Sequence, residues 1–152
     1  MGLTATLTNA VSGLRVNQDS LDILSRNIAN AGTPGYHRQA LNIVDYNSTR
    51  AAVRAAEDLK APIIVQVSVK TVQFWGADAL AGWIRQVAGP SPVPVAYHLD
   101  HCRDVDVVRQ CIDAGWTSVM IDASHLPYEE NLALTRQVCA MAAEAGVPLT
   151  AD

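Results

Sequence analysis

The spacing of apolar residues changes between residues 34 and 41, so the chain divides into two segments. In the first segment, leucine, isoleucine and alanine recur at alternating intervals of four and three residues, and the polar Asn17 takes the one remaining position. The repeating positions are Leu3, Leu7, Ala10, Leu14, Leu21, Leu24 and Ile28. This heptad pattern predicts a long α-helix of the coiled-coil type, and the glycine and proline within residues 30–35 predict its end.

The second segment alternates between short apolar runs and amphipathic stretches. The apolar runs predict strands at 41–44, 62–67, 93–99, 116–121 and 147–151, and the amphipathic stretches predict helices at 48–59, 77–87, 105–114 and 129–145. The strands start roughly every 20 to 30 residues, which is the spacing of βα units in a parallel sheet. The runs are continuously apolar, as expected of strands that helices cover. The fold class is therefore predicted to be α/β.

Composition narrows the range of partners. The chain has 152 residues, of which 49% are hydrophobic and 17% charged, and its formal net charge is -4. This composition is typical of a soluble globular protein. Its lysines and arginines are scattered, which argues against a nucleic-acid partner. No apolar stretch is long enough to cross a bilayer. Three cysteines without a C-x-x-C pair indicate reduced thiols and a cytoplasmic location.

Polar side chains follow the apolar runs of this second segment. Functional groups of parallel α/β folds gather at the carboxyl ends of the strands. The residues found there are Asn42, Asp45, Gln66, Ser68, His98, Asp100, His101, Asp122, Ser124, His125 and Asp152. We therefore expect a site at this end of the sheet.

The motif His98-Leu99-Asp100-His101 is the sharpest local signal. Residues three apart on a strand point to opposite faces, so at most one histidine faces a site, and His101 is the better placed. An aspartate beside a metal ligand suits general acid–base work, and Asp122 could supply a second carboxylate from the neighbouring strand. The alternative is that His98 is a hydrogen-bonded core residue and that Asp100 caps a helix or turn.

Residues 40–152 resemble the first half of the class II, zinc-dependent ketose-bisphosphate aldolases, which act on fructose- or tagatose-bisphosphate. The resemblance is carried by HLDH at 98–101, SVMIDASHLPYEEN at 118–131 and AAEAGVPLTAD at 142–152. It implies a partial (β/α)8 TIM barrel of about four βα units and a fifth strand, preceded by the coiled-coil type helix. It also implies reversible aldol cleavage of a ketose bisphosphate with Zn²⁺ at the substrate carbonyl.

The resemblance assigns roles to particular residues. Asp100 takes the position of the family's proton-transfer residue, His101 that of a zinc ligand and Asp122 that of a secondary metal position. The family usually carries an acidic pair in the last strand, where Thr150 departs from the pattern and Asp152 is a conservative replacement and candidate metal ligand.

The resemblance also places Asn42, Gln66 and Ser68 on the substrate side of the site. A catalytic zinc takes about three protein ligands, and the family's other two histidine ligands lie on later strands. We therefore expect little activity from this chain alone, and zinc binding and enzyme activity stay open. Open barrel edges favour association of copies into a homo-oligomer.

Residues 2–39 resemble the N-terminal helix of flagellar hook-associated proteins, through SGLRVNQDSLDILSRNIANAGTPGYHRQ at 12–39. The resemblance implies two domains, 1–39 and 40–152, and an alternative function as an axial structural protein of the bacterial flagellum. Its partners would then be flagellar axial subunits that pack against residues 3–28. Two further alternatives are a solvated amphipathic arm and a chimeric fragment without function.

Overall fold

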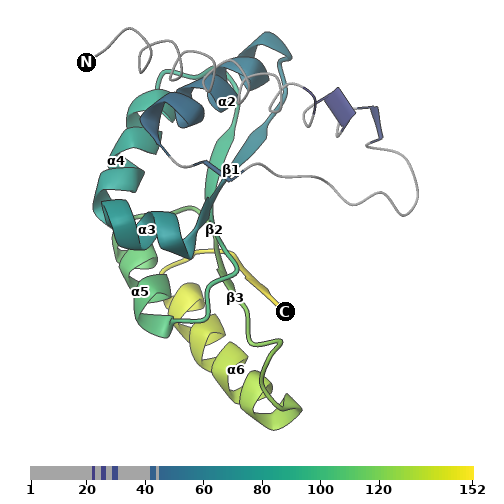
Figure 1. Cartoon of the computed structure of the whole chain (residues 1–152), viewed down its shortest axis with the longest axis vertical. Coiled ribbons are helices and arrows are strands. Elements are labelled where there is room, and N and C mark those ends of the chain that lie inside the picture. The colour runs from purple at the N-terminus through teal and green to yellow at the C-terminus, as the bar shows by residue number, and fades with distance from the viewer. Residues whose placement is uncertain (1–21, 23–24, 27–28, 31–41, 44) are drawn as a thin grey trace, which may run out of the picture.

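Strands and helices alternate along the part of the chain that the computed structural model describes, which is residues 22, 25–26, 29–30, 42–43 and 45–152. The elements are α2 (Tyr46–Asp58), β1 (Ile63–Ser68), α3 (Val69–Trp75), α4 (Ala77–Ala88), β2 (Val95–Asp100), α5 (Val105–Asp113), β3 (Val119–Ile121), α6 (Tyr128–Glu144) and β4 (Leu149–Ala151) (Figure 1). This order matches the alternation that the apolar pattern predicts.

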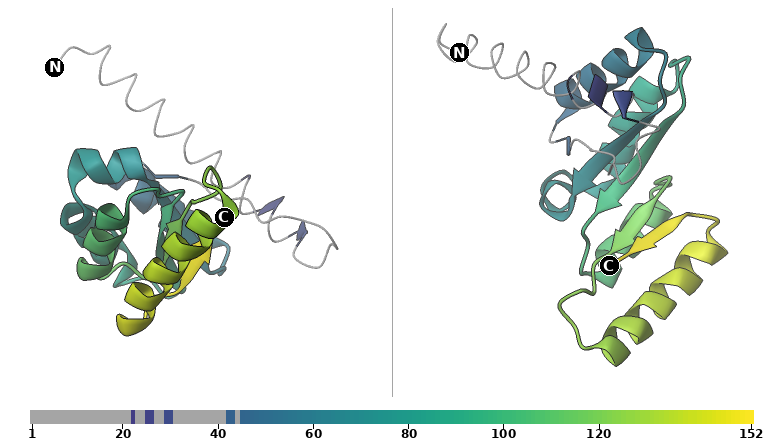
Figure 2. Two further views of the ribbon diagram at one scale, coloured as in Figure 1. Left: turned by 90° about the horizontal axis from the view of Figure 1, so that it is seen from below. Right: turned by 90° about the vertical axis from the view of Figure 1, so that its right-hand side faces the viewer.

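The strands form one parallel series. β1 pairs with β2, from Ile63 beside Val95 to Ser68 beside Asp100, and β3 pairs with β4. Two isolated parallel bridges, His98 with Ser118 and Cys102 with Ile121, connect the two pairs. Figure 1 shows α4, α3 and α5 in a row along one side of the strands, and Figure 2 shows the same arrangement from two other directions. This is the order and direction of strands expected of part of an α/β barrel.

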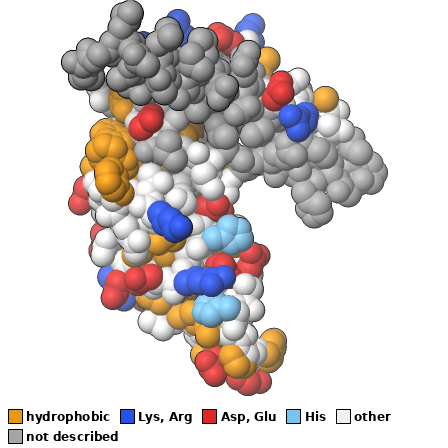
Figure 3. All heavy atoms as spheres, viewed as in Figure 1, with side chains coloured by type: hydrophobic (Ala, Val, Ile, Leu, Met, Phe, Trp, Pro, Cys, Tyr) orange, Lys and Arg blue, Asp and Glu red, His pale blue; other side chains and the backbone are white. Residues whose placement is uncertain are grey.

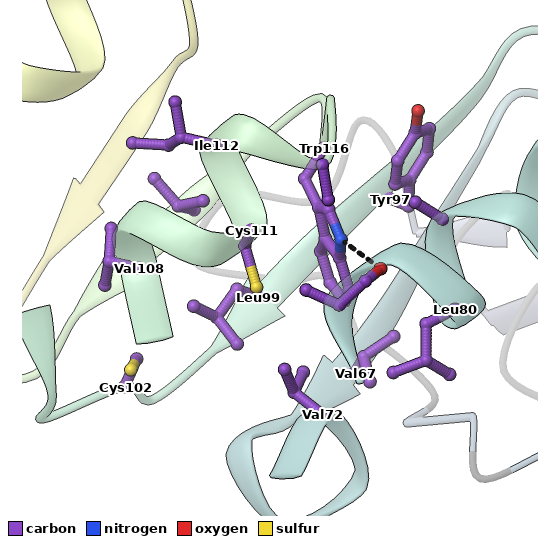
Figure 4. Close-up of a cluster of buried hydrophobic side chains, with 14 of the residues drawn as sticks. Val67, Val72, Leu80, Tyr97, Leu99, Cys102, Val108, Cys111, Ile112 and Trp116 are labelled. Atoms are coloured by element: carbon purple, nitrogen blue, oxygen red, sulfur yellow. Dashed lines mark hydrogen bonds between the residues drawn. The ribbon is translucent and has the colours of Figure 1, made fainter. Parts of the chain in front are cut away.

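The hydrophobic core lies between the strands and these helices. Trp116 is its largest fully buried side chain, and its indole Nε1 donates a hydrogen bond of 3.2 Å to the carbonyl oxygen of Ala77 at the start of α4 (Figure 4). The Tyr97 hydroxyl donates a 2.6 Å bond to the carbonyl oxygen of Gly115. The core therefore satisfies its few polar groups while joining β2, α4 and the turn before β3.

The opposite face of the strands carries the polar residues. Side chains alternate along a strand, so Val65, Val67 and Leu99 point into the core. The positions between them, Gln66 on β1 and His98 on β2, lie side by side on the other face. The polar face of the sheet therefore continues to the carboxyl ends of the strands.

The structure differs from the sequence predictions in three places. Residues 41–44, predicted as a strand, contribute one bridge among the described residues, between Asn42 and Gln66. Helix α3 was not predicted, because its seven residues are too few to show a helical period. Asp45 does not reach the site: its carboxylate accepts from the Ser48 backbone N–H at 2.8 Å and caps α2.

The predicted heptad helix lies mostly outside the described residues. Within that stretch, Asp22 and Arg26 are helical and form an ion pair of 3.5 Å. Among the described helices, none is both long and apolar enough to cross a membrane.

Candidate functional site

Asp100 ends β2, and the side-chain amides of Gln66 on β1 and of Asn42 before α2 hold its carboxylate. Gln66 Nε2 donates to Oδ1 at 2.8 Å and Asn42 Nδ2 donates to Oδ2 at 3.2 Å. The side chain is 14% exposed. Two of its roughly four lone-pair positions therefore remain for a ligand. The alternative interpretation of Asp100 as a helix or turn cap is wrong, because its carboxylate binds side chains across the sheet.

His101 follows Asp100 and turns its imidazole among three carboxylates. Its backbone has a φ of 46°, in the left-handed region, which costs a residue other than glycine about 1–2 kcal/mol. Nδ1 lies 3.5 Å from Asp122 Oδ2 and 3.8 Å from Asp152 Oδ2, and Nε2 lies 4.0 Å from Asp100 Oδ1. Four of the sequence-predicted site residues therefore come together.

Asp122 is buried, and each of its carboxylate oxygens already has two donors. Oδ1 accepts from the Ser124 hydroxyl at 2.6 Å and from the Ser124 backbone N–H at 3.2 Å. Oδ2 accepts from Arg103 Nε and Nη2, both at 3.2 Å. The Ser124 hydroxyl and, after it, the Arg103 guanidinium lower the pKa of Asp122 to about 2.

Arg103 was missed as a site residue by the sequence analysis, and Ser124 was noted only for its position after the strand. A serine two residues after an aspartate is a recognisable turn signal, so the Ser124 contact could have been anticipated. Nothing in the spacing of Arg103 pointed to Asp122. In Figure 3, histidine, basic and acidic side chains gather over β3 and the loop that follows it.

Three other polar residues of the motifs lie near this cluster with different partners. His98 is buried, its Nδ1 lies 2.8 Å from the Ser118 hydroxyl, and burial lowers its pKa, which confirms its interpretation as a hydrogen-bonded core histidine. Ser68 lies beside Asp100 in the sheet register, and its hydroxyl bonds that of Thr71 at 3.1 Å. His125 is exposed in the loop after β3.

The donors do not fit a metal ion as they are arranged. Among the described residues, no group of three histidine, cysteine or acidic side chains could hold one. Nδ1 of His101 faces Asp122 and Asp152, but Arg103 occupies the Asp122 oxygen on that side. Asp100 faces the other ring nitrogen, 4.0 Å away. A zinc ion needs ligands that converge at about 2 Å.

A parallel α/β series of strands with acids, amides and a histidine at the carboxyl ends is the arrangement found at the sites of the α/β-barrel class of folds. The chain belongs to the class II fructose-bisphosphate aldolase family, whose profile matches residues 24–152. The aldolase part of the sequence resemblance is thereby confirmed, and the family is generally zinc dependent.

Curated relatives support the same family. A fructose-bisphosphate aldolase of Helicobacter pylori is 38% identical over 119 residues, which cover 78% of this chain and 39% of that protein. A 6-phospho-5-dehydro-2-deoxy-D-gluconate aldolase of Halalkalibacterium halodurans is 40% identical over 114 residues, which cover 73% of this chain and 40% of that protein. The chain thus spans about two fifths of the length of these relatives.

Solved structures agree on the fold. The YdjI aldolase of Escherichia coli K12 superposes with a TM-score of 0.67 and 27% identity, over 72% of this chain and 43% of the other. A putative fructose-1,6-biphosphate aldolase of Coccidioides immitis superposes with a TM-score of 0.69 and 29% identity, over 74% and 39%. The described elements are therefore arranged as in part of an aldolase barrel.

The N-terminal segment matches a second family over a short stretch. The profile of the flagella basal body rod proteins matches residues 7–37. This stretch overlaps the aldolase match at residues 24–37. The match lies within the segment that resembles the flagellar hook-associated proteins, and that resemblance stays a prediction.

Proposed function

We propose that this chain carries the proton-transfer part of a class II aldolase site, which cleaves or forms a carbon–carbon bond in a phosphorylated ketose. The observation that carries the proposal is the Asp100 carboxylate, which Gln66 and Asn42 orient at the carboxyl ends of the strands. A general base must lie within hydrogen-bond reach of the proton that it takes. Asp100 has free lone pairs on both oxygens for this purpose.

In this proposal Asp100 takes the proton of the substrate hydroxyl at C4. The C3–C4 bond then breaks, C4 leaves as an aldehyde, and the electron pair passes into an enediolate on the ketone half. In the reverse direction Asp100 returns the proton. Because the described donors do not fit a zinc ion as arranged, proton transfer is the step that this chain's own residues support.

The substrate side of the proposed site is formed by Asn42, Gln66 and Ser68. The amides of Asn42 and Gln66 already bind Asp100. They would therefore position the base and contact the substrate beside Asp100. The relatives are named for a fructose bisphosphate and for a 6-phospho-5-dehydro sugar acid, so a phosphorylated keto sugar is the class of substrate proposed. The free state of the three cysteines agrees with the proposed cytoplasmic location.

A coupled assay for triose phosphate release, with and without added Zn²⁺, tests the proposal. We expect slow turnover, because no described donors converge on an ion. Asp100→Asn removes the base without changing its shape, and Asp113→Asn makes the same change at an exposed position of α5. Loss of turnover in the first variant alone supports the proposal, and turnover that survives Asp100→Asn contradicts it.

A second function, association with flagellar axial subunits, is favoured by residues 7–37 alone. It uses the proposed division into residues 1–39 and 40–152. Co-sedimentation with assembled axial subunits, compared between the full chain and a variant lacking residues 1–34, tests it. Equal co-sedimentation of both proteins contradicts this function.

Pairing of two copies through the strand edges is proposed as a route to oligomers. Within the described part of the chain, β4 pairs on one side only, with β3. Analytical ultracentrifugation tests the pairing, and a monomer at all concentrations contradicts it.

A further inference from the structure

Ser68 ends β1 directly beside Asp100, the carboxylate that the proposed function uses as a base. The two residues are partners in the register of β1 and β2. Side chains alternate along a strand, so Ser68 points to the same face as Gln66, whose amide binds Asp100. The Ser68 hydroxyl therefore lies on the polar face of the sheet, next to the carboxylate.

The hydroxyl of Ser68 is not used to cap the helix that follows it. Ser68 is the residue before α3 and has an extended backbone, yet its side chain makes no capping hydrogen bond. A serine in this place commonly accepts from a backbone N–H of the first turn. Here its Oγ lies instead 3.1 Å from Oγ1 of Thr71, the third residue of α3. The contact joins two hydroxyl groups, and either oxygen can donate.

Thr71 is the more firmly held member of this pair. Its side chain is buried, with 9% exposed, whereas Ser68 is half-buried at the end of its strand. A hydroxyl offers one proton and two lone pairs. When Thr71 donates to Ser68, the proton of Ser68 is free for an oxygen atom on the polar face. A side chain that is oriented in advance also loses less conformational entropy when a ligand binds.

We propose that Thr71 is a positioning residue of the site: it holds the Ser68 hydroxyl beside Asp100, where Ser68 donates a hydrogen bond to an oxygen of the phosphorylated ketose. The proposal rests on the proposed function, which supplies the class of ligand. Thr71 is not among the residues that the sequence resemblance places at the site. It acts through Ser68 without touching the substrate, so its loss weakens substrate binding and leaves proton transfer at Asp100 in place.

Calorimetric titration of the full chain with fructose 1,6-bisphosphate tests this role. Every variant carries Asp100→Asn as well, so that the sugar is not cleaved during the titration. Thr71→Val keeps the shape and removes the hydroxyl, and we expect the Kd to rise roughly threefold to tenfold. Thr71→Ser restores the hydroxyl and should restore the affinity. Thr135→Val is the matched control, because Thr135 is a half-buried helical threonine whose hydroxyl bonds Asn131 Oδ1 at 3.2 Å.

A double variant separates the hydroxyl contact from a general effect of packing. Once Ser68→Ala has removed the partner, adding Thr71→Val should weaken binding no further. Circular dichroism checks that each variant is folded, and Thr71→Ala replaces Thr71→Val if the latter is not. An unchanged Kd in Thr71→Val overturns the role, as does an equal loss in Thr71→Ser or a further loss in the double variant. Absence of binding by the parent chain overturns it too.

Kinetics separate this role from the proposed function. With Asp100 intact, Thr71→Val should raise the KM in the coupled aldolase assay and leave kcat nearly unchanged. A fall in kcat without a change in KM overturns the positioning role. Turnover that survives Asp100→Asn contradicts the proposed function alone, because the titrations measure binding of the sugar and not its cleavage.

Discussion

Gln66 Nε2 donates a hydrogen bond of 2.8 Å to Asp100 Oδ1 across the neighbouring strands β1 and β2. Gln66 lies beside His98 in the register, and Asp100 lies two residues further along β2, beside Ser68. The bond is therefore a diagonal contact on the polar face of the sheet. It fixes the orientation of the carboxylate before any substrate arrives.

Gln66→Leu removes this donor while keeping the size of the side chain. A hydrogen bond to a charged group is worth about 1.5–3 kcal/mol, so we expect kcat to fall about tenfold or more. The KM should change less, since Gln66 acts mainly through Asp100. Steady-state kinetics in the coupled aldolase assay measure both constants. Gln73→Leu, at an exposed position of α3, is the control, and a wild-type kcat for Gln66→Leu contradicts the role.

The arrangement of elements could be predicted from the sequence because it follows from local patterns. The apolar run at 62–67 became β1 at Ile63–Ser68, and the long amphipathic stretch at 129–145 became α6 at Tyr128–Glu144. A glycine follows α3, α4, α5 and α6 within two residues, and a proline directly precedes β1, β2 and β4, so both residue types mark boundaries of the elements. The convergence of Asp100 and Asp122 follows in turn from the parallel direction of the strands.

The local chemistry of the site could not be predicted in the same way. The pairing of Arg103 with Asp122 depends on the path of a loop and on one rotamer, and neither leaves a period in the sequence. The left-handed backbone of His101 turns its ring toward Asp122, whereas a regular strand would send it elsewhere. Tertiary contacts decide both features.

Trp116 should be the most costly core residue to remove. Trp116→Ala loses a side chain that is 1% exposed and leaves a cavity, so we expect the free energy of unfolding to fall by about 3–5 kcal/mol. Phe74→Ala removes an aromatic ring that is 76% exposed and should change it by about 0.5 kcal/mol at most. Urea titrations of both variants measure the difference, and equal losses would show that the core is not centred on Trp116.

The stability of the folded chain should depend on Asp122 in acid. Its pKa is lowered from 3.8 to about 2, so the folded state holds the ionised form more strongly than the unfolded state does. This contribution is complete above pH 3.8 and is lost as the pH falls toward 2. Urea titrations across that interval measure the loss, and the Asp122→Asn variant should lose less stability over it.

Ser124→Ala tests the cause of that shift. It removes the hydroxyl that donates to Asp122 Oδ1 at 2.6 Å, so the pKa of Asp122 should move back toward 3.8. A carbon-13 NMR titration of the Asp122 carboxyl reports the value directly. Ser91→Ala, in the loop before β2, should leave the pKa of Asp122 unchanged. An unaltered pKa of Asp122 in the Ser124→Ala variant would show that Arg103 causes the shift instead.

The three cysteines should differ sharply in reactivity toward a thiol reagent. Cys139 is exposed on α6, whereas Cys102 and Cys111 are buried. Burial raises the pKa of both buried thiols, that of Cys111 to about 12, and only the thiolate is a nucleophile. We expect one thiol per chain to react quickly in buffer and all three in denaturant. Cys139→Ser should abolish the fast reaction, and a fast phase that persists in this variant would show that the core around Cys102 and Cys111 is open.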